Sequence, residues 1–260
     1  MTEKVLIDHD GPVTIVTINR ANVRNAIDRE TAAAVAAAFR AFDEDSAARV
    51  AVLCGAGGQF GAGADLKAIA AGDSLRFSET GDSPLGPIRL RLRKPVIAAV
   101  AGYAVAGGMA LALWCDLRVV ERSATFGMFD RRFGVPMLGG VTVNLPRLIG
   151  LSRAMDLVLT GRPVTAEEAW DMGLANRLVA EGEALAAATA LAHEIAAYPW
   201  DCVVSDRLAL LESLDLTSEQ GQLNEYRLGI RNFESGTAQT GAARFAGGSG
   251  KPDEPEGPQP

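Results

Sequence analysis

A run of 20 residues without a charged side chain, residues 96–115, limits what this chain can fold into more than any other feature of its sequence. The run is long enough for a helix to cross a lipid bilayer. However, seven of its residues are alanine and three are glycine, so transfer into lipid would gain little. Pro95 and Asp116 bound the run, and its glycines interrupt it. We therefore expect a buried strand over residues 96–100, a turn and a buried helix over residues 108–114, not a membrane span.

Other apolar segments follow the same pattern of strands that alternate with helices and glycine-rich turns. We expect a β-hairpin of residues 5–8 and 13–18 around Asp10-Gly11, a helix over residues 29–42 capped by Asp28, and strands over residues 50–54 and 117–120. Strands that alternate with helices favour a mostly parallel sheet. The sequence therefore predicts an α/β fold.

The second half of the chain has few strand signals after Leu178. Helices are expected over residues 145–159, after the capping box Thr165-Ala-Glu-Glu168, and over residues 181–198, 203–214 and 218–233. We expect an α/β domain over residues 1–200, a helical C-terminal subdomain over residues 201–246 and a disordered tail over residues 247–260. The polar, turn-rich residues 71–86 are expected to form a mobile loop over a site.

Charge and cysteine content exclude several classes of function. The net charge is −7 and the pI is about 5.0, which argues against a broad nucleic-acid or anionic-membrane surface. The three widely spaced cysteines and the absence of a secretory segment favour reduced thiols in a cytoplasmic protein. The two histidines, His9 and His193, are too far apart in sequence to suggest a histidine-rich metal site, so no metal is expected.

Two glycine-rich loops, residues 60–66 and 102–109, each follow a buried strand and precede a helix. Glycine allows close approach of a ligand, and backbone N–H groups at a helix N-terminus favour negative charge. Two such N–H groups that converge from two loops form an oxyanion hole. Neither loop has the spacing of a dinucleotide-binding motif, and no P-loop motif occurs. Spacing alone also allows two tight turns without a ligand.

Several motifs, in order along the chain, together carry a resemblance to a known family. They are Arg24-Asn-Ala26, Phe60-Gly-Ala-Gly-Ala-Asp-Leu66, Gly102-Tyr-Ala-Val-Ala-Gly-Gly108, Leu113-Trp-Cys-Asp116, Ala124-Thr-Phe-Gly127, Leu145-Pro-Arg-Leu-Ile-Gly150, Leu159-Thr-Gly-Arg-Pro163 and Gly173-Leu-Ala-Asn176. From about residue 4 to 245 the chain resembles the crotonase (enoyl-CoA hydratase/isomerase) superfamily. The resemblance implies a spiral of ββα units, a homotrimer or a dimer of trimers, and an acyl-CoA thioester as substrate, with coenzyme A as part of the substrate and no separate cofactor.

The resemblance also implies roles for individual residues. The backbone N–H groups of Ala64 and Gly107 would hold the thioester oxygen as it becomes an enolate. Contacts to coenzyme A would come from Arg24, Ala26, Ala62, Ala64, Asp65, Leu66, Lys67 and Gly107. Two of these residues have a second interpretation. Arg24 would then be a solvated charge on the surface, and Asp65 would be the N-cap of a helix. Gly139-Gly140 would open a helix toward the acyl chain or would simply start a helix.

The sequence departs from the family's pattern at the catalytic acids. A hydratase of this family uses two glutamates, and the corresponding positions here are Ala110 and Asp130. Alanine transfers no proton, and aspartate is shorter than glutamate by about 1.5 Å. Contact with Arg131 or Arg132 would lower the pKa of Asp130 and weaken it as a base.

These departures favour one of three functions. Isomerisation of a double bond by the single base Asp130 is favoured over efficient hydration. A non-catalytic acyl-CoA-binding protein is the alternative. A serine hydrolase of related fold is disfavoured, because no serine follows the second glycine-rich loop near Gly108-Met109.

Overall fold

The computed structural model describes residues 3–248, so most of the expected tail, residues 249–260, lies outside the described residues. The chain divides into two units, of which the first ends at Ala196 and the second begins at Ala197. The boundary expected at residue 200 falls at the first residue of helix α8 (Trp200–Ser213). The first unit contains the strands and both glycine-rich loops, so it holds the candidate site.

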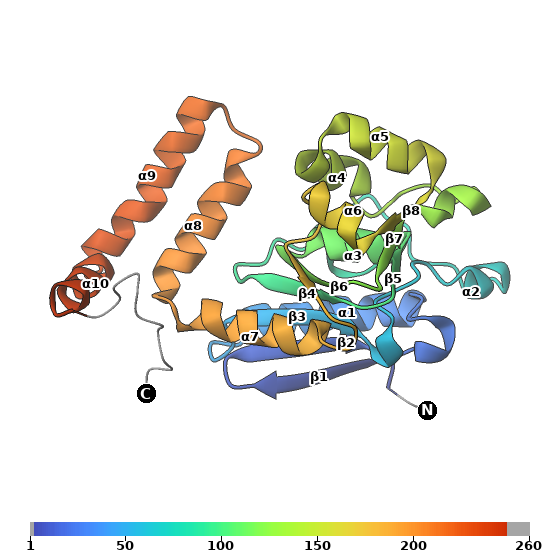
Figure 1. The fold of residues 1–260 in the computed structure, drawn as a ribbon, viewed down its shortest axis with the longest axis horizontal. Helices are drawn as coiled ribbons and strands as arrows, with labels where there is room; N and C mark the ends of the chain where they lie inside the picture. The colour runs from blue at the N-terminus through green and yellow to red at the C-terminus, as the bar shows by residue number, and fades with distance from the viewer. Residues whose placement is uncertain (1–2, 249–260) are drawn as a thin grey trace. The chain divides into compact units, whose positions relative to one another are not determined.

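The first unit is built on a six-stranded sheet in the order β1-β2-β3-β4-β6-β9 (Figure 1). Its strands are β1 (Val5–Asp10), β2 (Val13–Ile18), β3 (Val50–Gly55), β4 (Val96–Val100), β6 (Leu117–Glu121) and β9 (Arg177–Val179). Strands β1 and β2 pair antiparallel through the expected hairpin, with Gly11 in its turn at φ +55°. Every other neighbouring pair in this sheet is parallel, which confirms the predicted α/β architecture.

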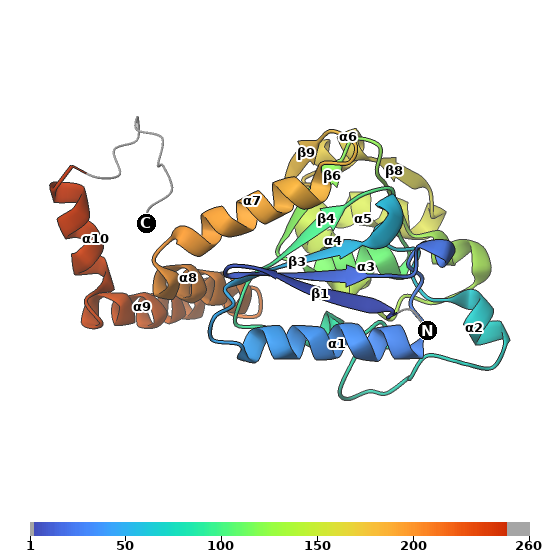
Figure 2. The ribbon, with the colours of Figure 1, turned by 90° about the horizontal axis from the view of Figure 1, so that it is seen from below.

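Helices cover both faces of this sheet, which explains why its central strands are apolar throughout. Strands of the sheet lie between α1 (Arg29–Glu44) and α7 (Ala184–Ala197) in Figure 2. Asp28 caps α1 as predicted, because its side chain accepts a hydrogen bond from the Thr31 backbone N–H (2.8 Å). Helix α1 buries Phe39 and Phe42 on its sheet-facing side. The parallel strands are therefore shielded from water on both sides.

The uncharged run of residues 96–115 folds into strand β4, strand β5 (Tyr103–Val105) and helix α3 (Gly107–Trp114). Strand β5 belongs to a second, three-stranded sheet with β7 (Thr125–Gly127) and β8 (Pro163–Thr165). Between residues 3 and 248, no helix is both long enough and apolar enough to cross a bilayer. The expected strand and buried helix are therefore confirmed, whereas the segment expected as a turn contains strand β5.

One helix expected as continuous is two helices. Residues 145–159 were predicted to be helical without a break, but α4 (Val141–Ile149) and α5 (Leu151–Thr160) meet at Gly150. Gly150 has φ +81°, which no helical residue adopts, so the chain turns there. The remaining helical segments of the first unit are α2 (Leu66–Ala70), α6 (Ala166–Asp171) and the 3-10 turns η1 (Ala21–Val23), η2 (Ala56–Gly58), η3 (Pro87–Arg89) and η4 (Phe129–Phe133).

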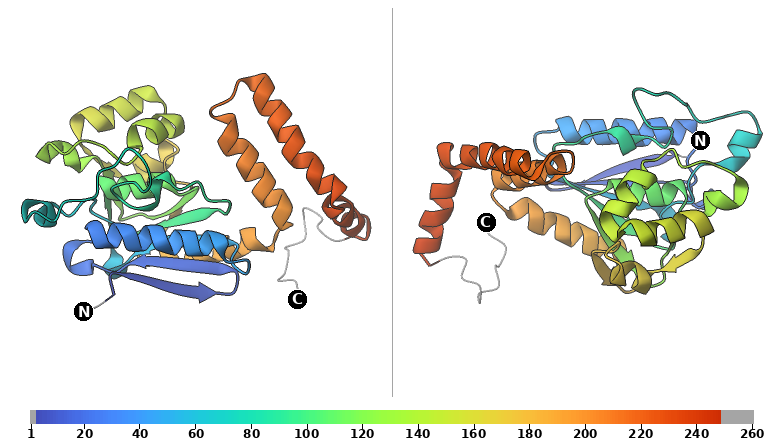
Figure 3. Two further views of the ribbon diagram at one scale, coloured as in Figure 1. Left: turned by 180° about the vertical axis from the view of Figure 1, so that it is seen from behind. Right: turned by 90° about the horizontal axis from the view of Figure 1, so that it is seen from above.

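The second unit is helical, as expected. Helices α8 and α9 (Ser218–Glu234) run side by side in opposite directions, and α10 (Thr237–Ala246) follows them (Figure 3). Thr217 and Gln220 form a capping box at the start of α9. Helix α10 was not predicted.

Arg118 of β6 is a buried cation in the core of the first unit, where it binds carbonyl groups at the C-terminal end of helix α3. Its side chain is 2% exposed and donates hydrogen bonds to the carbonyls of Ala112, Cys115, Asp116 and Leu174 and to the side chain of Asn176. A cation at a helix C-terminus is favourable, and here it also satisfies buried carbonyl groups. Arg118 thereby fixes the helix whose first residue lies at the candidate site.

An Arg118→Met variant is expected to lose about 3 kcal/mol of unfolding free energy, because several buried carbonyl groups lose their donors. Urea unfolding followed by circular dichroism measures this loss. Arg122→Met is the matched control, since Arg122 is exposed and its ion pair with Glu167 spans 3.7 Å. That exposed pair contributes under about 1 kcal/mol. Equal unfolding midpoints for the two variants would contradict this role of Arg118.

Candidate active site

The two glycine-rich loops lie against each other through their backbones. The backbone N–H of Gly61 donates to the carbonyl of Tyr103 (2.8 Å), and the N–H of Val105 donates to the carbonyl of Gly61 (3.0 Å). An ideal Cβ on Gly108 would lie only 2.0 Å from the Gly61 carbonyl oxygen. No side chain fits between the loops at this point. The glycines are therefore required by close approach of two backbones, as well as by local turns.

This packing brings Ala64 and Gly107 to one pocket. Ile27 and Ala64 form a parallel bridge, in which Ile27 makes hydrogen bonds with Gly63 and Asp65, the two neighbours of Ala64. The backbone N–H of Ala64 therefore points away from Ile27. An ideal Cβ on Gly63 would lie 2.5 Å from the backbone nitrogen of Gly107. Ala64 and Gly107 both line the same cavity. The two residues expected to form an oxyanion hole are therefore neighbours in space.

Ala106, immediately before Gly107, has a strained backbone. Its φ of 51° and ψ of −121° lie in a region that residues with a Cβ seldom occupy. Such a conformation costs about 1–3 kcal/mol and persists only where the surrounding structure enforces it. Here the Ala106 N–H donates to the carbonyl of Gly127 (2.8 Å), across to strand β7. The strained turn fixes the direction of the next N–H, that of Gly107.

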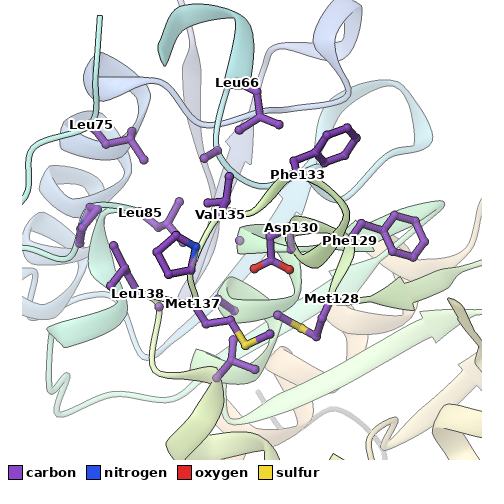
Figure 4. Close-up of a pocket in the computed structure, with 18 of the residues that line it drawn as sticks. Leu66, Leu75, Leu85, Met128, Phe129, Asp130, Phe133, Val135, Met137 and Leu138 are labelled. Carbon is purple, nitrogen blue, oxygen red and sulfur yellow. The ribbon is translucent and has the colours of Figure 1, made fainter. Parts of the chain in front are cut away.

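The pocket is a small apolar cavity of about 180 Å³. Figure 4 shows its side chains, with the Asp130 carboxylate directed into the space that they surround. The residues that line it are Ala62, Ala64, Leu66, Ile69, Leu75, Phe77, Pro84, Leu85, Ala106, Gly107, Ala110, Met128, Phe129, Asp130, Phe133, Val135, Pro136, Met137, Leu138, Gly139 and Val141. Asp130 is the only titratable residue among them. Four of the lining residues come from the loop predicted over residues 71–86, whose mobility stays a prediction.

Asp130 lies in η4 and has a carboxylate oxygen in an unusual setting. Its Oδ1 is buried and has no hydrogen-bond partner within residues 3–248. Burial raises the pKa of this carboxyl group. Nearby backbone N–H groups and the charge of Arg131 lower the pKa, but the effect of burial is larger, so the net shift is upward. A carboxylate with a raised pKa in an apolar pocket is suited to accept and return a proton.

The two arginines that follow Asp130 bind other groups, so the contact that would lower the pKa of Asp130 is not made, and that pKa is raised. The Nε of Arg131 donates to the carbonyl of Val158 (3.2 Å), and the guanidinium of Arg132 donates to the carbonyl of Gly161 (3.3 Å). Arg132 also stacks on the Phe129 ring at 3.9 Å from its centre. Sequence adjacency indicated contact with Asp130, but neighbouring carbonyls bind these cations instead.

Ala110 occupies the first of the two expected catalytic positions and lines the pocket. It lies in α3 and is 1% exposed. An ideal Cβ on Gly139 would lie 2.7 Å from the Ala110 methyl carbon, so these two small residues meet at the pocket wall. Gly140 is the N-cap of α4, and Gly139 and Val141 on either side of it line the pocket; that this helix points toward the acyl chain stays a prediction.

The residues expected to contact coenzyme A divide into two groups. Ala62, Ala64, Leu66 and Gly107 line the pocket, whereas Arg24, Ala26, Asp65 and Lys67 do not. Arg24 and Lys67 are exposed, and the Arg24 guanidinium lies 5.5 Å from the centre of the Tyr103 ring. The buried Ala26 belongs to the segment that precedes Ile27.

Asp65 is a helix cap, which is the second of its two interpretations. Its carboxylate accepts hydrogen bonds from the backbone N–H groups of Lys67 and Ala68, both at 3.1 Å. Burial raises its pKa, but these N–H groups and Arg20 outweigh that effect and lower it. Its side chain is therefore engaged within the protein, where it starts α2 next to Ala64.

Sequence reasoning missed Arg20, which holds the loop that carries Ala64. One nitrogen of its guanidinium contacts Asp65 (2.9 Å) and Asp28 (3.1 Å), and another donates to the Ala26 carbonyl. Arg20 thus joins the caps of α1 and α2. No pattern in the sequence marks an arginine after strand β2 for this role, because its partners come from two separate segments, one with Ala26 and Asp28 and the other with Asp65.

Comparisons with known proteins point to one family. The pattern of the family described as enoyl-CoA hydratase/isomerase matches residues 8–248. Enoyl-CoA hydratase EchA19 of Mycobacterium tuberculosis is 37% identical over 246 residues, which cover 93% of this chain and 92% of that protein. Carnitinyl-CoA dehydratase of Salmonella arizonae is 40% identical over 199 residues, 75% of each chain.

Solved structures show the same fold. A crystal structure of an enoyl-CoA hydratase from Mycobacterium tuberculosis has a TM-score of 0.88 and 38% identity, and covers 94% of this chain and 95% of that one. Enoyl-CoA hydratase EchA1 from Mycobacterium marinum has a TM-score of 0.87 and 37% identity over the same shares. The fold class expected from the resemblance is confirmed. This chain belongs to the enoyl-CoA hydratase/isomerase family, whose members act on acyl-CoA thioesters.

Proposed function

We propose that this protein moves a double bond within an acyl-CoA thioester, with Asp130 as its single acid–base residue. The observation that carries the proposal is the buried, unpartnered Oδ1 of Asp130 in the pocket that Ala64 and Gly107 line. Desolvation of this carboxylate raises its pKa toward the range in which a group both takes and returns a proton.

Each step of the reaction can be written with these groups. A 3-enoyl thioester binds with its carbonyl oxygen at the N–H groups of Ala64 and Gly107. The Asp130 carboxylate takes a proton from C2, and the electron pair of that bond forms an enolate whose negative oxygen accepts both hydrogen bonds. Asp130, now a carboxylic acid, donates the same proton to C4. The C3–C4 double bond becomes a C2–C3 double bond, and no water is consumed.

Hydration needs two groups that transfer protons, and the described residues of this pocket do not provide both. Addition of water needs one group to activate the water and another to supply a proton to the acyl chain. The family resemblance places Ala110 at the position of the first glutamate, and its methyl side chain has no proton to transfer. Asp130 is the only carboxylate among the pocket-lining residues of the described chain. One carboxylate is sufficient for isomerisation, because the proton that it removes is the proton that it returns.

The test compares two substrates by the absorbance of the conjugated thioester. A short 3-enoyl-CoA is expected to gain absorbance in the presence of the protein, and a short 2-enoyl-CoA is expected to keep its absorbance apart from a small reverse reaction. Rapid loss of absorbance from the 2-enoyl substrate, with 3-hydroxyacyl-CoA as product, would establish hydration and overturn the proposal.

A non-catalytic acyl-CoA-binding protein is the second candidate, and Ala110 is the observation that favours it. This candidate predicts no absorbance change with either substrate, while butanoyl-CoA still binds in isothermal titration calorimetry. The two candidates thus differ in turnover and agree in binding.

The coenzyme itself is expected to extend away from the acyl pocket. We propose that Arg24 and Lys67 contact its phosphate groups, because both are exposed cations on the segments that flank Ala62 and Ala64. Guanidinium and ammonium groups are the usual partners of phosphate. A trimer or a dimer of trimers remains a prediction from the family resemblance.

The rate is expected to depend on pH through Asp130. The base is active as a carboxylate, so kcat/KM should rise with pH through the pKa of this group in the free enzyme. Because burial raises that pKa, the midpoint of the acidic limb should lie above the ordinary aspartate value of 3.8. A pH profile of 3-enoyl-CoA turnover measures it, and a midpoint at or below 3.8 would contradict this assignment.

A further inference from the structure

Leu85 fills the space beside the glycine that would bind the thioester oxygen. An ideal Cβ on Gly107 would lie 2.8 Å from Leu85 Cδ1 and 3.0 Å from Cδ2. An ideal Cβ on Gly139 would lie 3.1 Å from the same Cδ1. The Leu85 side chain therefore lies between Gly107 and Gly139. Gly139 in turn lies against the Ala110 methyl group at the pocket wall. Figure 4 shows its side chain among those around the cavity.

The backbone around Leu85 is firmly held. Ser83 and Gly86 form an antiparallel bridge, and the Gly86 N–H donates to the Ser83 carbonyl (2.9 Å). Gly86 has φ +93° and lies so close to helix α1 that a Cβ there would be 2.6 Å from the Ala32 carbonyl oxygen. Residues 83–87 are all buried. The backbone of Leu85 is thus held in place, and its side chain is 8% exposed.

We propose that Leu85 makes this protein selective for acyl-CoA thioesters that carry no substituent at C2. The inference rests on the proposed function, because it places the thioester oxygen at the N–H of Gly107. C2 is bonded directly to the thioester carbon, so it must lie next to that glycine. One side of C2 must be open to Asp130, and a substituent would need the remaining space that the two methyl groups of Leu85 fill.

The physical basis of this selectivity is steric. Protein interiors are close-packed, so an added methyl group forces side chains or backbone to shift. The turn at Ser83–Gly86 and its contact with α1 prevent an easy shift of Leu85. Hydrophobic pockets distinguish ligands that differ by one carbon by about 10-fold to 200-fold. We expect discrimination of this order between a straight and a C2-methylated acyl group.

Isothermal titration calorimetry with two unreactive thioesters tests the proposal. Butanoyl-CoA is the straight probe, and 2-methylbutanoyl-CoA, which differs from it only by one methyl group at C2, is the branched probe. The unchanged protein is expected to bind butanoyl-CoA at least about 10-fold more tightly. In Leu85→Ala this ratio should fall to within about 3-fold, mainly because the methylated ester gains affinity. Leu85→Val, which retains more of the core contacts, should give an intermediate ratio and covers the case that Leu85→Ala does not fold.

Leu92→Ala is the matched control. Leu92 is 8% exposed, as Leu85 is, but it does not line the pocket. Its removal should leave the ratio of the two affinities as it is in the unchanged protein. Equal affinity for the two esters in the unchanged protein, or the same ratio in Leu85→Ala, would overturn the proposal.

The same experiment separates this inference from the proposed function. Absence of butanoyl-CoA binding would contradict the acyl-CoA site itself. Tight binding of both esters, together with Asp130-dependent turnover of a straight 3-enoyl-CoA, would leave the proposed reaction intact and reject only the role of Leu85.

Discussion

An Asp130→Asn variant is expected to lose about 10²-fold to 10⁴-fold in kcat for double-bond migration, which is the usual contribution of a general acid–base group. The amide has nearly the same shape as the carboxylate but cannot take a proton from C2. Binding of butanoyl-CoA should remain, because Asp130 does not hold the thioester oxygen. The gain of absorbance from a short 3-enoyl-CoA measures the rate, and calorimetry measures the binding.

The stability of this variant supplies an internal check with a defined sign. The folded-state pKa of Asp130 is raised above the ordinary value of 3.8, so the unfolded chain loses its proton first as pH rises. The buried carboxylate therefore lowers stability above its folded pKa and has no such effect below 3.8. Asp130→Asn should raise the thermal midpoint at neutral pH, and this gain should vanish toward pH 3.

Asp171→Asn serves as the matched control, because it makes the same chemical change at an exposed aspartate at the end of helix α6. This control should keep the turnover of the unchanged protein. Full activity in a folded Asp130→Asn protein would reject Asp130 as the base. A lowered thermal midpoint at neutral pH would show that the carboxylate has a stabilising partner and would reject the proposed cause of its raised pKa.

A Gly63→Ala variant is expected to lose about 10²-fold to 10³-fold in kcat, which is the usual cost of removing one oxyanion-hole donor. The new Cβ would lie 2.5 Å from the Gly107 nitrogen and 2.9 Å from the Ala106 methyl carbon, so one of the two glycine-rich loops must move. Such a shift separates the N–H groups of Ala64 and Gly107. Steady-state kinetics with the 3-enoyl substrate should show the loss mainly in kcat.

Gly63 also has φ +87°, so part of the effect of an alanine is backbone strain. Gly182→Ala controls for that strain, because Gly182 has φ +84° and nothing lies within 4 Å of an added Cβ. Both variants should lose stability through the positive φ, by about 1–2 kcal/mol. Only Gly63→Ala should lose turnover. A Gly63→Ala protein with normal kcat would show that the two N–H groups do not act together.

Local sequence signals predicted much of the first unit. Asp28 caps α1, Gly11 closes the first hairpin, and the uncharged run contains β4 and α3. Each of these features depends on residues close together in the chain, and such local rules can be read from sequence. The break at Gly150 was missed because the apolar pattern continues across it, whereas its positive φ appears only in the folded chain.

The sequence by itself determined the family, the α/β fold class, the two glycine-rich loops and the presence of Ala110 and Asp130 at the positions where the resemblance implies catalytic glutamates. Only the tertiary structure decided the environment of Asp130, because the carbonyls of Val158 and Gly161 accept hydrogen bonds from the arginines that the sequence places beside it. It also decided that Leu85 lies against Gly107. The physical reason is that pKa values and pocket walls depend on which groups meet in space. Those contacts are made by side-chain direction and long-range packing, which spacing along the chain does not specify.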